Sequence, residues 1–175
     1  MRFLFIITQK TKSLGCFDTE AFLLKLTSLI ATHNSFRCFL FNAVICVSTE
    51  CHDLSLTDCT ESQLLFMNEV GMPNFRTYWQ MLFSLSDDEQ IKSLRAVRES
   101  GMLTNIHVYQ YKVTEDSRER KLLLDGFDVW SKLFSLFEGD ETERFAMLEF
   151  VGGYPEESFF EDSATLIKLA DISNA

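Results

Sequence analysis

The pattern of apolar and polar positions alternates between strand-like and helix-like segments over the first 47 residues. Residues 3–8 are a short apolar run between polar residues, which predicts a buried strand. Apolar side chains then recur at helical spacing between Asp18 and Ile30, and residues 36–47 return to the aromatic and β-branched types that strands prefer. Because two parallel strands need a crossover, usually a helix, this order favours a parallel sheet.

Capping signals predict three helices between residues 60 and 101. In a capping box, the N-cap side chain and the side chain three residues later each bond to the other residue's backbone N–H. Two residue pairs have this spacing, and an asparagine can cap the helix between them, whose apolar residues would share one face. The residues concerned are Thr60 and Gln63, Asn74 with Phe75, Tyr78, Trp79 and Leu82, Ser86 and Glu89, and the terminating glycines Gly71 and Gly101.

The second half of the chain gives a less regular pattern. Residues 105–113 nearly alternate and predict a strand, whereas residues 129–137 and 166–170 have the spacing of helices. Residues 117–125 and 144–151 are compatible with either strand or helix. The order of elements predicts an α/β protein, a single globular domain over residues 1–175, with a mostly parallel sheet of about four strands and helices on its faces. The alternative is an α+β fold with antiparallel hairpins around residues 105–125.

Composition and charge narrow the class of protein. The chain has 175 residues, of which 46% are hydrophobic, enough for one sizeable core. Its 26 acidic residues against 16 basic ones give a net charge of −10, which argues against direct nucleic-acid binding. The apolar run Phe3 to Ile7 is too short for a secretion signal, and no stretch has the length of a membrane span. We therefore expect a cytoplasmic protein that binds no membrane, and the sequence leaves its oligomeric state open.

The cysteines raise the possibility of a metal site. All five lie among the first 59 residues, and an odd number without a signal peptide indicates reduced thiols. Cys46, Cys51, His52 and Cys59 carry ligand types that suit zinc. Their C-x4-C-H-x6-C spacing lacks the paired knuckles of structural zinc sites. We predict no metal and no cofactor.

An enzyme is the alternative to a binding protein. In α/β folds, functional groups gather where strands end, so a small enzyme could use residues that follow the first two strands. These are Lys10, Lys12, Cys16, Cys51 and His52, and a Cys/His pair would be the reactive element. No glycine-rich phosphate motif or serine-nucleophile motif accompanies them. We assign no catalytic residue. His107, within an apolar strand, is interpreted as a half-buried, hydrogen-bonded side chain.

Charge is distributed unevenly along the chain. Residues 138–175 hold ten acids against Arg144 and Lys168, so −8 of the net −10 lies in the last 38 residues. A field of one sign speeds encounter with a partner of opposite sign, and aromatic residues among the acids can anchor it. The sequence therefore predicts a non-enzymatic, acidic protein-binding domain, an inhibitor or immunity-type neutraliser of a basic protein such as a toxin or nuclease. The predicted partner-binding residues are Glu141, Glu143, Phe150, Tyr154, Glu156, Glu157 and Phe159.

Overall fold

The structure, a computed structural model, describes residues 46–52, 55–114, 117–150 and 155–173. The chain divides into two compact units. Their described parts are residues 46–82 and 96–104, called here the central unit, and residues 83–95 and 105–173, called the C-terminal unit. The elements predicted for residues 3–8 and 18–30, and nearly all of the strand predicted for residues 36–47, lie outside the described residues. A single domain over residues 1–175 stays a prediction.

Within the described residues, four strands form one sheet in the order β1-β2-β3-β6. Their bounds are Val47–Thr49 for β1, Phe75–Trp79 for β2, Leu103–Val108 for β3 and Phe145–Leu148 for β6. β1 pairs in parallel with β2, and β3 pairs in parallel with β6. The predicted α/β fold with a mostly parallel sheet of four strands is confirmed. The sequence had left β6 open between strand and helix.

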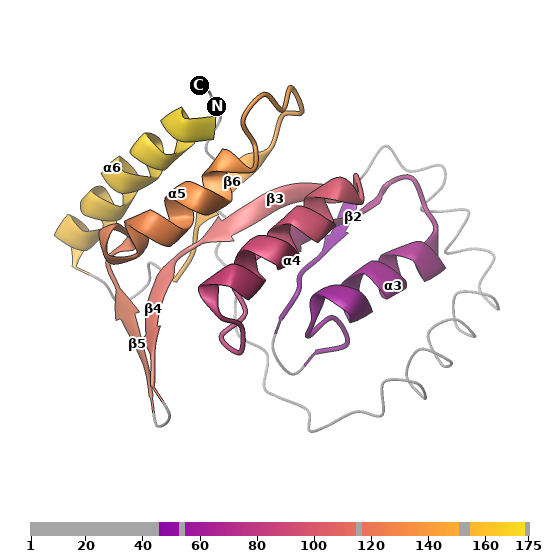
Figure 1. The fold of residues 1–175 in the computed structure, drawn as a ribbon, viewed down its shortest axis with the longest axis horizontal. Helices are drawn as coiled ribbons and strands as arrows, with labels where there is room; N and C mark the ends of the chain where they lie inside the picture. Colours follow the sequence, from indigo (N-terminus) through magenta and orange to yellow (C-terminus); the bar gives the residue numbers. More distant parts are fainter. Residues whose placement is uncertain (1–45, 53–54, 115–116, 151–154, 174–175) are drawn as a thin grey trace. The chain divides into compact units, whose positions relative to one another are not determined.

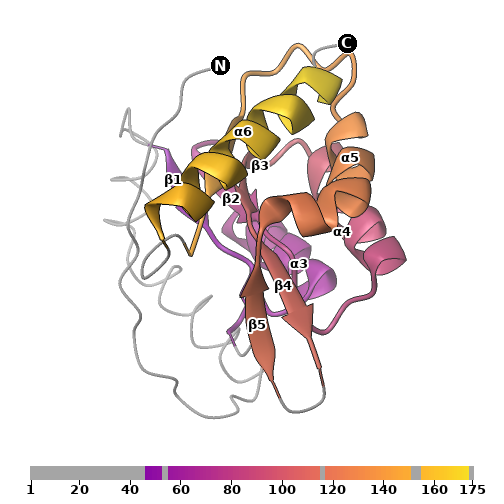
Figure 2. The same ribbon diagram turned by 90° about the vertical axis from the view of Figure 1, so that its left-hand side faces the viewer.

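A hairpin follows β3 as a separate two-stranded sheet. β4, Gln110–Val113, pairs in an antiparallel manner with β5, Arg118–Lys121, and Gln110 lies opposite Lys121. Figure 2 shows the two strands extending together to a turn. The predicted strand over residues 105–113 is therefore two strands, which Tyr109 separates. The antiparallel pairing considered for the α+β alternative exists here as an addition to the parallel sheet.

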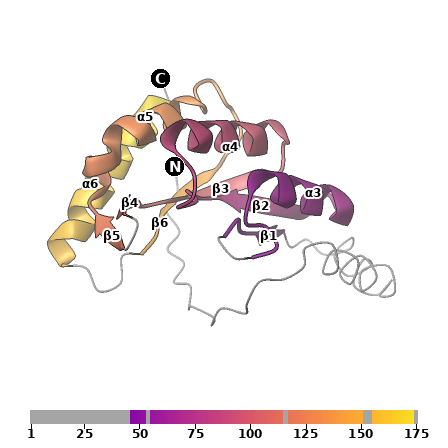
Figure 3. The same cartoon turned by 60° about the horizontal axis from the view of Figure 1, so that its bottom comes forward.

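In the central unit, α3, Thr60–Val70, packs over β2 (Figure 3). The helix is the one predicted from the capping signals, but its N-cap is Cys59, one residue earlier than the expected Thr60. The backbone N–H of Ser62 donates to Cys59 Sγ, and the N–H of Cys59 donates to Ser62 Oγ, which completes a capping box. Gly71 ends the helix in the left-handed conformation that glycine adopts without strain (φ 59°).

Residues 75–79 form strand β2 and not the helix that the sequence predicted. Phe75, Thr77 and Trp79 are buried in alternation with half-buried residues, which is the period of a strand. Thr77 is a polar residue in a core position, so its hydroxyl needs partners. It receives a hydrogen bond from Gln63 Nε2 and donates to the carbonyl of Thr49 (3.1 Å). Gln63, expected in a capping box, is thus a buried core partner of β2.

An apolar cluster fills the space between α3 and the strands of the central unit. Phe66 and Phe75 pack edge to face, with ring centroids 5.6 Å apart. The remaining members are Met67, Val70, Val47, Leu56, Met72 and Met102. These contacts explain why a helix with few charged residues is stable here.

Helix α4, Asp87–Glu99, forms as the sequence predicts. Ser86 donates hydrogen bonds to Glu89 Oε2 from both its backbone N–H (2.8 Å) and its hydroxyl (2.6 Å). Three acidic residues occupy its first turn, where they interact favourably with the helix dipole. Gly101 follows the helix with φ 72°.

The C-terminal unit continues after the hairpin with a 3-10 turn, η1 (Leu123–Gly126), and α5 (Phe127–Ser135). The chain then passes through β6 to α6, Glu156–Ser173. α5 and α6 lie side by side (Figure 1). α5 confirms the helix predicted for residues 129–137, and α6 confirms the final helix, beginning ten residues before Leu166. No helix in the described part of the chain has both the length and the apolar composition needed to cross a bilayer.

Candidate interaction surface

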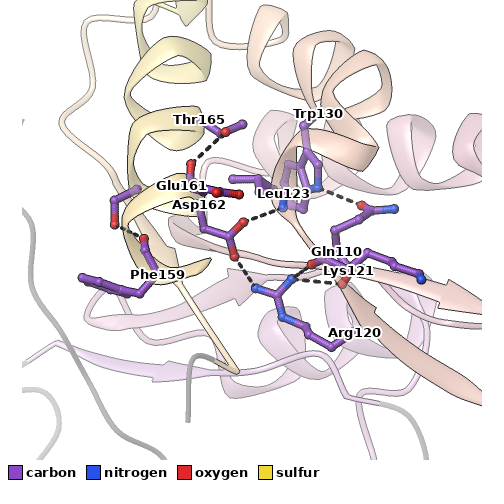
Figure 4. A network of polar contacts seen from close by, with 10 residues as sticks. Gln110, Arg120, Lys121, Leu123, Trp130, Phe159, Glu161, Asp162 and Thr165 are labelled. Carbon is purple, nitrogen blue, oxygen red and sulfur yellow. Dashed lines mark hydrogen bonds and ion pairs between the residues drawn. The ribbon is translucent and has the colours of Figure 1, made fainter. Parts of the chain in front are cut away.

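A buried polar network fixes α6 against the hairpin (Figure 4). Asp162 of α6 is 1% exposed, and its Oδ2 lies 2.8 Å from Nη2 of Arg120 on β5. Its Oδ1 accepts a hydrogen bond from the backbone N–H of Leu123 (2.6 Å). Arg120 Nη1 donates to the carbonyls of Gln110 and Lys121. The carboxylate thus joins α6 to β5 and η1, and this contact determines which side of α6 faces inward.

The inner face of α6 is apolar apart from Asp162 and Thr165. The buried residues recur every three or four positions and are Asp162, Thr165, Leu166, Leu169 and Ala170. The opposite face is exposed and consists of Glu156, Glu157, Phe160, Glu161, Ala164, Ile167, Lys168 and Asp171. Phe160 is 60% exposed and Ile167 is 51% exposed. We call this opposite face the outer face of α6.

Three of the ten acids in residues 138–175 are not available to a partner. Asp162 is paired with Arg120, and Asp140 is paired with Arg144 at 2.5 Å. Glu149 is largely buried, with Oε2 3.2 Å from Nδ1 of His107. The other seven are exposed and belong to two groups. Glu138, Glu141 and Glu143 lie between α5 and β6, whereas Glu156, Glu157, Glu161 and Asp171 lie on α6.

The two groups of exposed acids are mostly separate in space. β6 carries the chain back between the α5–β6 connection, residues 136–144, and the start of α6. Figures 1 and 2 both place this connection at the end of the unit where α6 finishes. A helix of 18 residues is about 27 Å long, so Glu156 and Glu157 lie roughly that far from the other end of α6. The structure therefore does not bring Glu141 and Glu143 together with Glu156 and Glu157.

The α5–β6 connection is held by Asp140. Its Oδ1 accepts from the backbone N–H of Thr142 (3.0 Å), and its Oδ2 binds Arg144, whose guanidinium lies 5.6 Å from the centroid of the Phe137 ring. Partial burial acts to raise the pKa of Asp140, but the hydrogen bonds from Thr142 and the charge of Arg144 outweigh it and lower that pKa to about 2. Asp140 therefore stabilises this connection as a carboxylate.

The predicted aromatic anchors have different environments. The ring of Phe150 packs edge to face on Tyr109 and Tyr111, at centroid distances of 4.9 and 5.7 Å. Phe150 also has φ 57°, a strained conformation for a non-glycine residue, which these ring contacts help to stabilise. Phe150 is thus held within the unit. Phe159 is half-buried, and Tyr154 lies outside the described residues.

Sequence reasoning omitted two apolar residues from the predicted partner-binding set. Phe160 packs edge to face on Phe159, with centroids 5.8 Å apart, and extends the apolar surface outward. Ile167 lies two turns further along the same face. The spacing of Leu166, Leu169 and Ala170 contained the necessary signal. When it is extended back to Asp162, it places Phe160 on the opposite side of the helix.

The residues of the metal and enzyme alternatives do not form one site. Cys46 and His52 are exposed, Cys51 is buried after β1, and Cys59 caps α3. No three of these four side chains, all among the described residues, offer ligand atoms within 4.8 Å of one another. Lys10, Lys12 and Cys16 lie outside the described residues.

His107 and Glu149 form a different pair, at the carboxyl ends of two neighbouring parallel strands. Met147 of β6 is the register partner of His107, and the N–H of Glu149 donates to the carbonyl of Val108. A carboxylate beside an imidazole orients the ring, an arrangement found both in acid–base sites and in buried structural contacts. Here the pair links β3 to β6 from largely buried positions.

Comparison with known proteins adds no family to this description. No protein-family model matches the chain, and the search of curated proteins finds no match either.

Proposed function

We propose that the protein is a non-enzymatic binding domain that recognises a basic protein through the outer face of α6. The observation that carries this proposal is the exposure of Phe160 and Ile167 among Glu156, Glu157 and Glu161. Large aromatic and aliphatic side chains in the centre of a contact supply most of its binding energy. Surrounding charges of one sign supply the rate and selectivity of encounter.

The role that this surface would serve is neutralisation of a basic partner, as an inhibitor of a toxin or nuclease does. Such a partner carries a positive patch for nucleic acid or for an acidic target, and an acidic surface competes for that patch. The net charge of −10 supports the same polarity over the whole protein. Glu141 and Glu143 belong to this proposal only as long-range contributors to the field, because they lie away from the start of α6.

The test begins with capture of a partner from native cells on the immobilised full chain, at low and at high salt. The association rate is then measured for the wild type and two matched double variants, Glu156→Lys/Glu157→Lys and Glu141→Lys/Glu143→Lys. We expect the α6 pair to slow association roughly tenfold at low salt and the loop pair to slow it much less. Both effects should shrink as salt screens charges beyond about 8 Å.

A captured partner that proves acidic would overturn the proposal, as would equal association rates for the wild type and the α6 variant. Thermal unfolding of both variants is the control for folding. Because all four glutamates are exposed, the midpoints should stay close to that of the wild type.

A further inference from the structure

We propose that the segment bound by the outer face of α6 is a basic amphipathic α-helix. This inference rests on the proposed function and specifies the partner for the same surface. It follows from the arrangement of apolar and charged residues along α6, from the hydrogen-bonding state of a helix surface, and from the sign of its charges.

The apolar residues of the outer face form a straight ridge. Phe160, Ala164 and Ile167 follow one another at intervals of four and three residues, and all three are exposed. At 100° per residue they fall within an arc of about 60°. Glu157 and Glu161 occupy the neighbouring arc, so the ridge has an acidic flank along its first two turns.

A helix is the segment that best covers such a ridge. The backbone N–H and C=O groups within α6 bond to one another, so this face cannot pair with an extended strand, which needs such groups from its receptor. A segment buried on it must satisfy its own backbone, and a helix does so. Phe160 and Ile167 are seven residues apart, about 10 Å along the axis, which matches apolar residues that recur every seven positions on a second helix.

The charges predict the polar residues of that helix. Glu157 and Glu161 are four residues apart on α6, about 6 Å along its axis. Lysine or arginine residues three or four positions apart beside the apolar seam of the partner would meet them. A helix with an acidic flank would face the same two carboxylates and be repelled.

The experiment uses the full chain and three synthetic peptides of 18 residues. The first places leucine and lysine with the period of an amphipathic helix, the second alternates the same residues with the period of a strand, and the third replaces lysine by glutamate in the helical pattern. Affinities are measured by calorimetry, and circular dichroism reports the helicity of the bound peptide. We expect the helical Leu/Lys peptide to bind at least tenfold more tightly than either control and to gain helicity on binding.

Variants of the chain then locate the bound peptide. Phe160→Ala and Ile167→Ala should each weaken the helical Leu/Lys peptide several-fold. Leu124→Ala, at an exposed leucine of η1, is the matched control and should leave the affinity unchanged. Glu157→Lys/Glu161→Lys should weaken the same peptide at least tenfold, with Glu138→Lys/Glu141→Lys as the charge control.

The outcomes separate this inference from the proposed function. If the strand-patterned peptide binds as tightly, or if the Phe160 and Ile167 variants bind normally, the helix inference is wrong, although a basic protein can still be the partner. If Glu157→Lys/Glu161→Lys changes neither peptide binding nor association with the captured protein, the proposed function itself is wrong.

Discussion

Asp162 on α6 and Arg120 on β5 form an ion pair in which both side chains are at least nine-tenths buried. The two residues are 42 positions apart, and their contact connects the last helix to the hairpin. Desolvation of two charges is costly, so such a pair contributes little net stability compared with apolar residues of the same size. Removal of one partner alone is different, because it leaves an uncompensated charge in the interior.

The first prediction concerns this pair. Asp162→Ala should lower the free energy of unfolding by about 3–5 kcal/mol, because it leaves the Arg120 guanidinium without its carboxylate and the N–H of Leu123 without its acceptor. Urea denaturation measures the change. Asp171→Ala, at an exposed acid of the same helix, is the control and should change stability by less than about 0.5 kcal/mol.

If Asp162→Ala does not fold, the double-mutant cycle with Arg120→Met still tests the pair. We expect the two changes to be non-additive by about 1–3 kcal/mol, with the double variant more stable than the sum of the single losses predicts. Simple additivity would show that the two side chains do not stabilise each other.

The second prediction concerns the approach of η1 to β4. A Cβ atom at Gly126 would lie 2.2 Å from Oε1 of Gln110, which also accepts a hydrogen bond from Nε1 of Trp130 (3.3 Å). Gly126→Ala should therefore displace the Gln110 side chain, break its bond to Trp130 and cost about 1–3 kcal/mol in thermal or urea unfolding.

Gln110→Ala removes the obstacle, so it serves as the partner variant in this test. In a Gln110→Ala background, the further change Gly126→Ala should cost less than about 0.5 kcal/mol, because φ at Gly126 is −107° and suits any residue. An equal cost in both backgrounds would place the conflict elsewhere.

The sequence predicted α4, α5 and α6 because each shows a capping signal or a regular apolar stripe on one face. β2 was mistaken for a helix because its central core residue is polar. Thr77 breaks the visible alternation of Phe75 and Trp79, and its burial depends on Gln63, fourteen positions away in the sequence. A hydrogen bond between elements cannot be derived from local periodicity.

The candidate surface was predicted in sign but only partly in residues. Counting acids located the charge in the last 38 residues, yet the count includes Asp162, which a distant arginine draws into the interior. Phe159 was chosen over Phe160 because the start of α6 was unknown, and the phase of a helix decides which of two adjacent residues is exposed. Glu141 and Glu156 were grouped together because their spatial separation depends on the direction of β6.

The third prediction concerns pH. Asp140 has a pKa lowered from its ordinary value of 3.8 to about 2, so its carboxylate stabilises the folded state above about pH 4, and this contribution disappears as the pH falls toward 2. Asp140→Asn should therefore be less stable than the wild type at pH 6, and the difference should close between about pH 4 and pH 2. Unfolding by urea at a series of pH values measures it.

Glu141→Gln is the control for this pH dependence, since it removes a negative charge from an exposed neighbour on the same connection. Its stability difference from the wild type should be small, as expected for a surface charge. If Asp140→Asn gave a difference that was constant from pH 6 to pH 2, the bonds to Thr142 and Arg144 would not depend on the ionised carboxylate.

The last prediction concerns the start of α3, where a thiol occupies a position at which hydroxyl and carboxylate groups are preferred. Cys59 Sγ accepts from the N–H of Ser62 at 3.4 Å, and sulfur is a weak acceptor. Cys59→Ser should therefore raise the free energy of unfolding by about 0.5–1 kcal/mol, and Cys59→Ala should lower it because the N–H loses its partner. Thermal unfolding under reducing conditions orders the three proteins. Cys46→Ser, at an exposed thiol before β1, controls for the general effect of replacing sulfur by oxygen and should leave the midpoint unchanged. A Cys59→Ser variant no more stable than Cys59→Ala would show that the Cys59 side chain does not cap the helix.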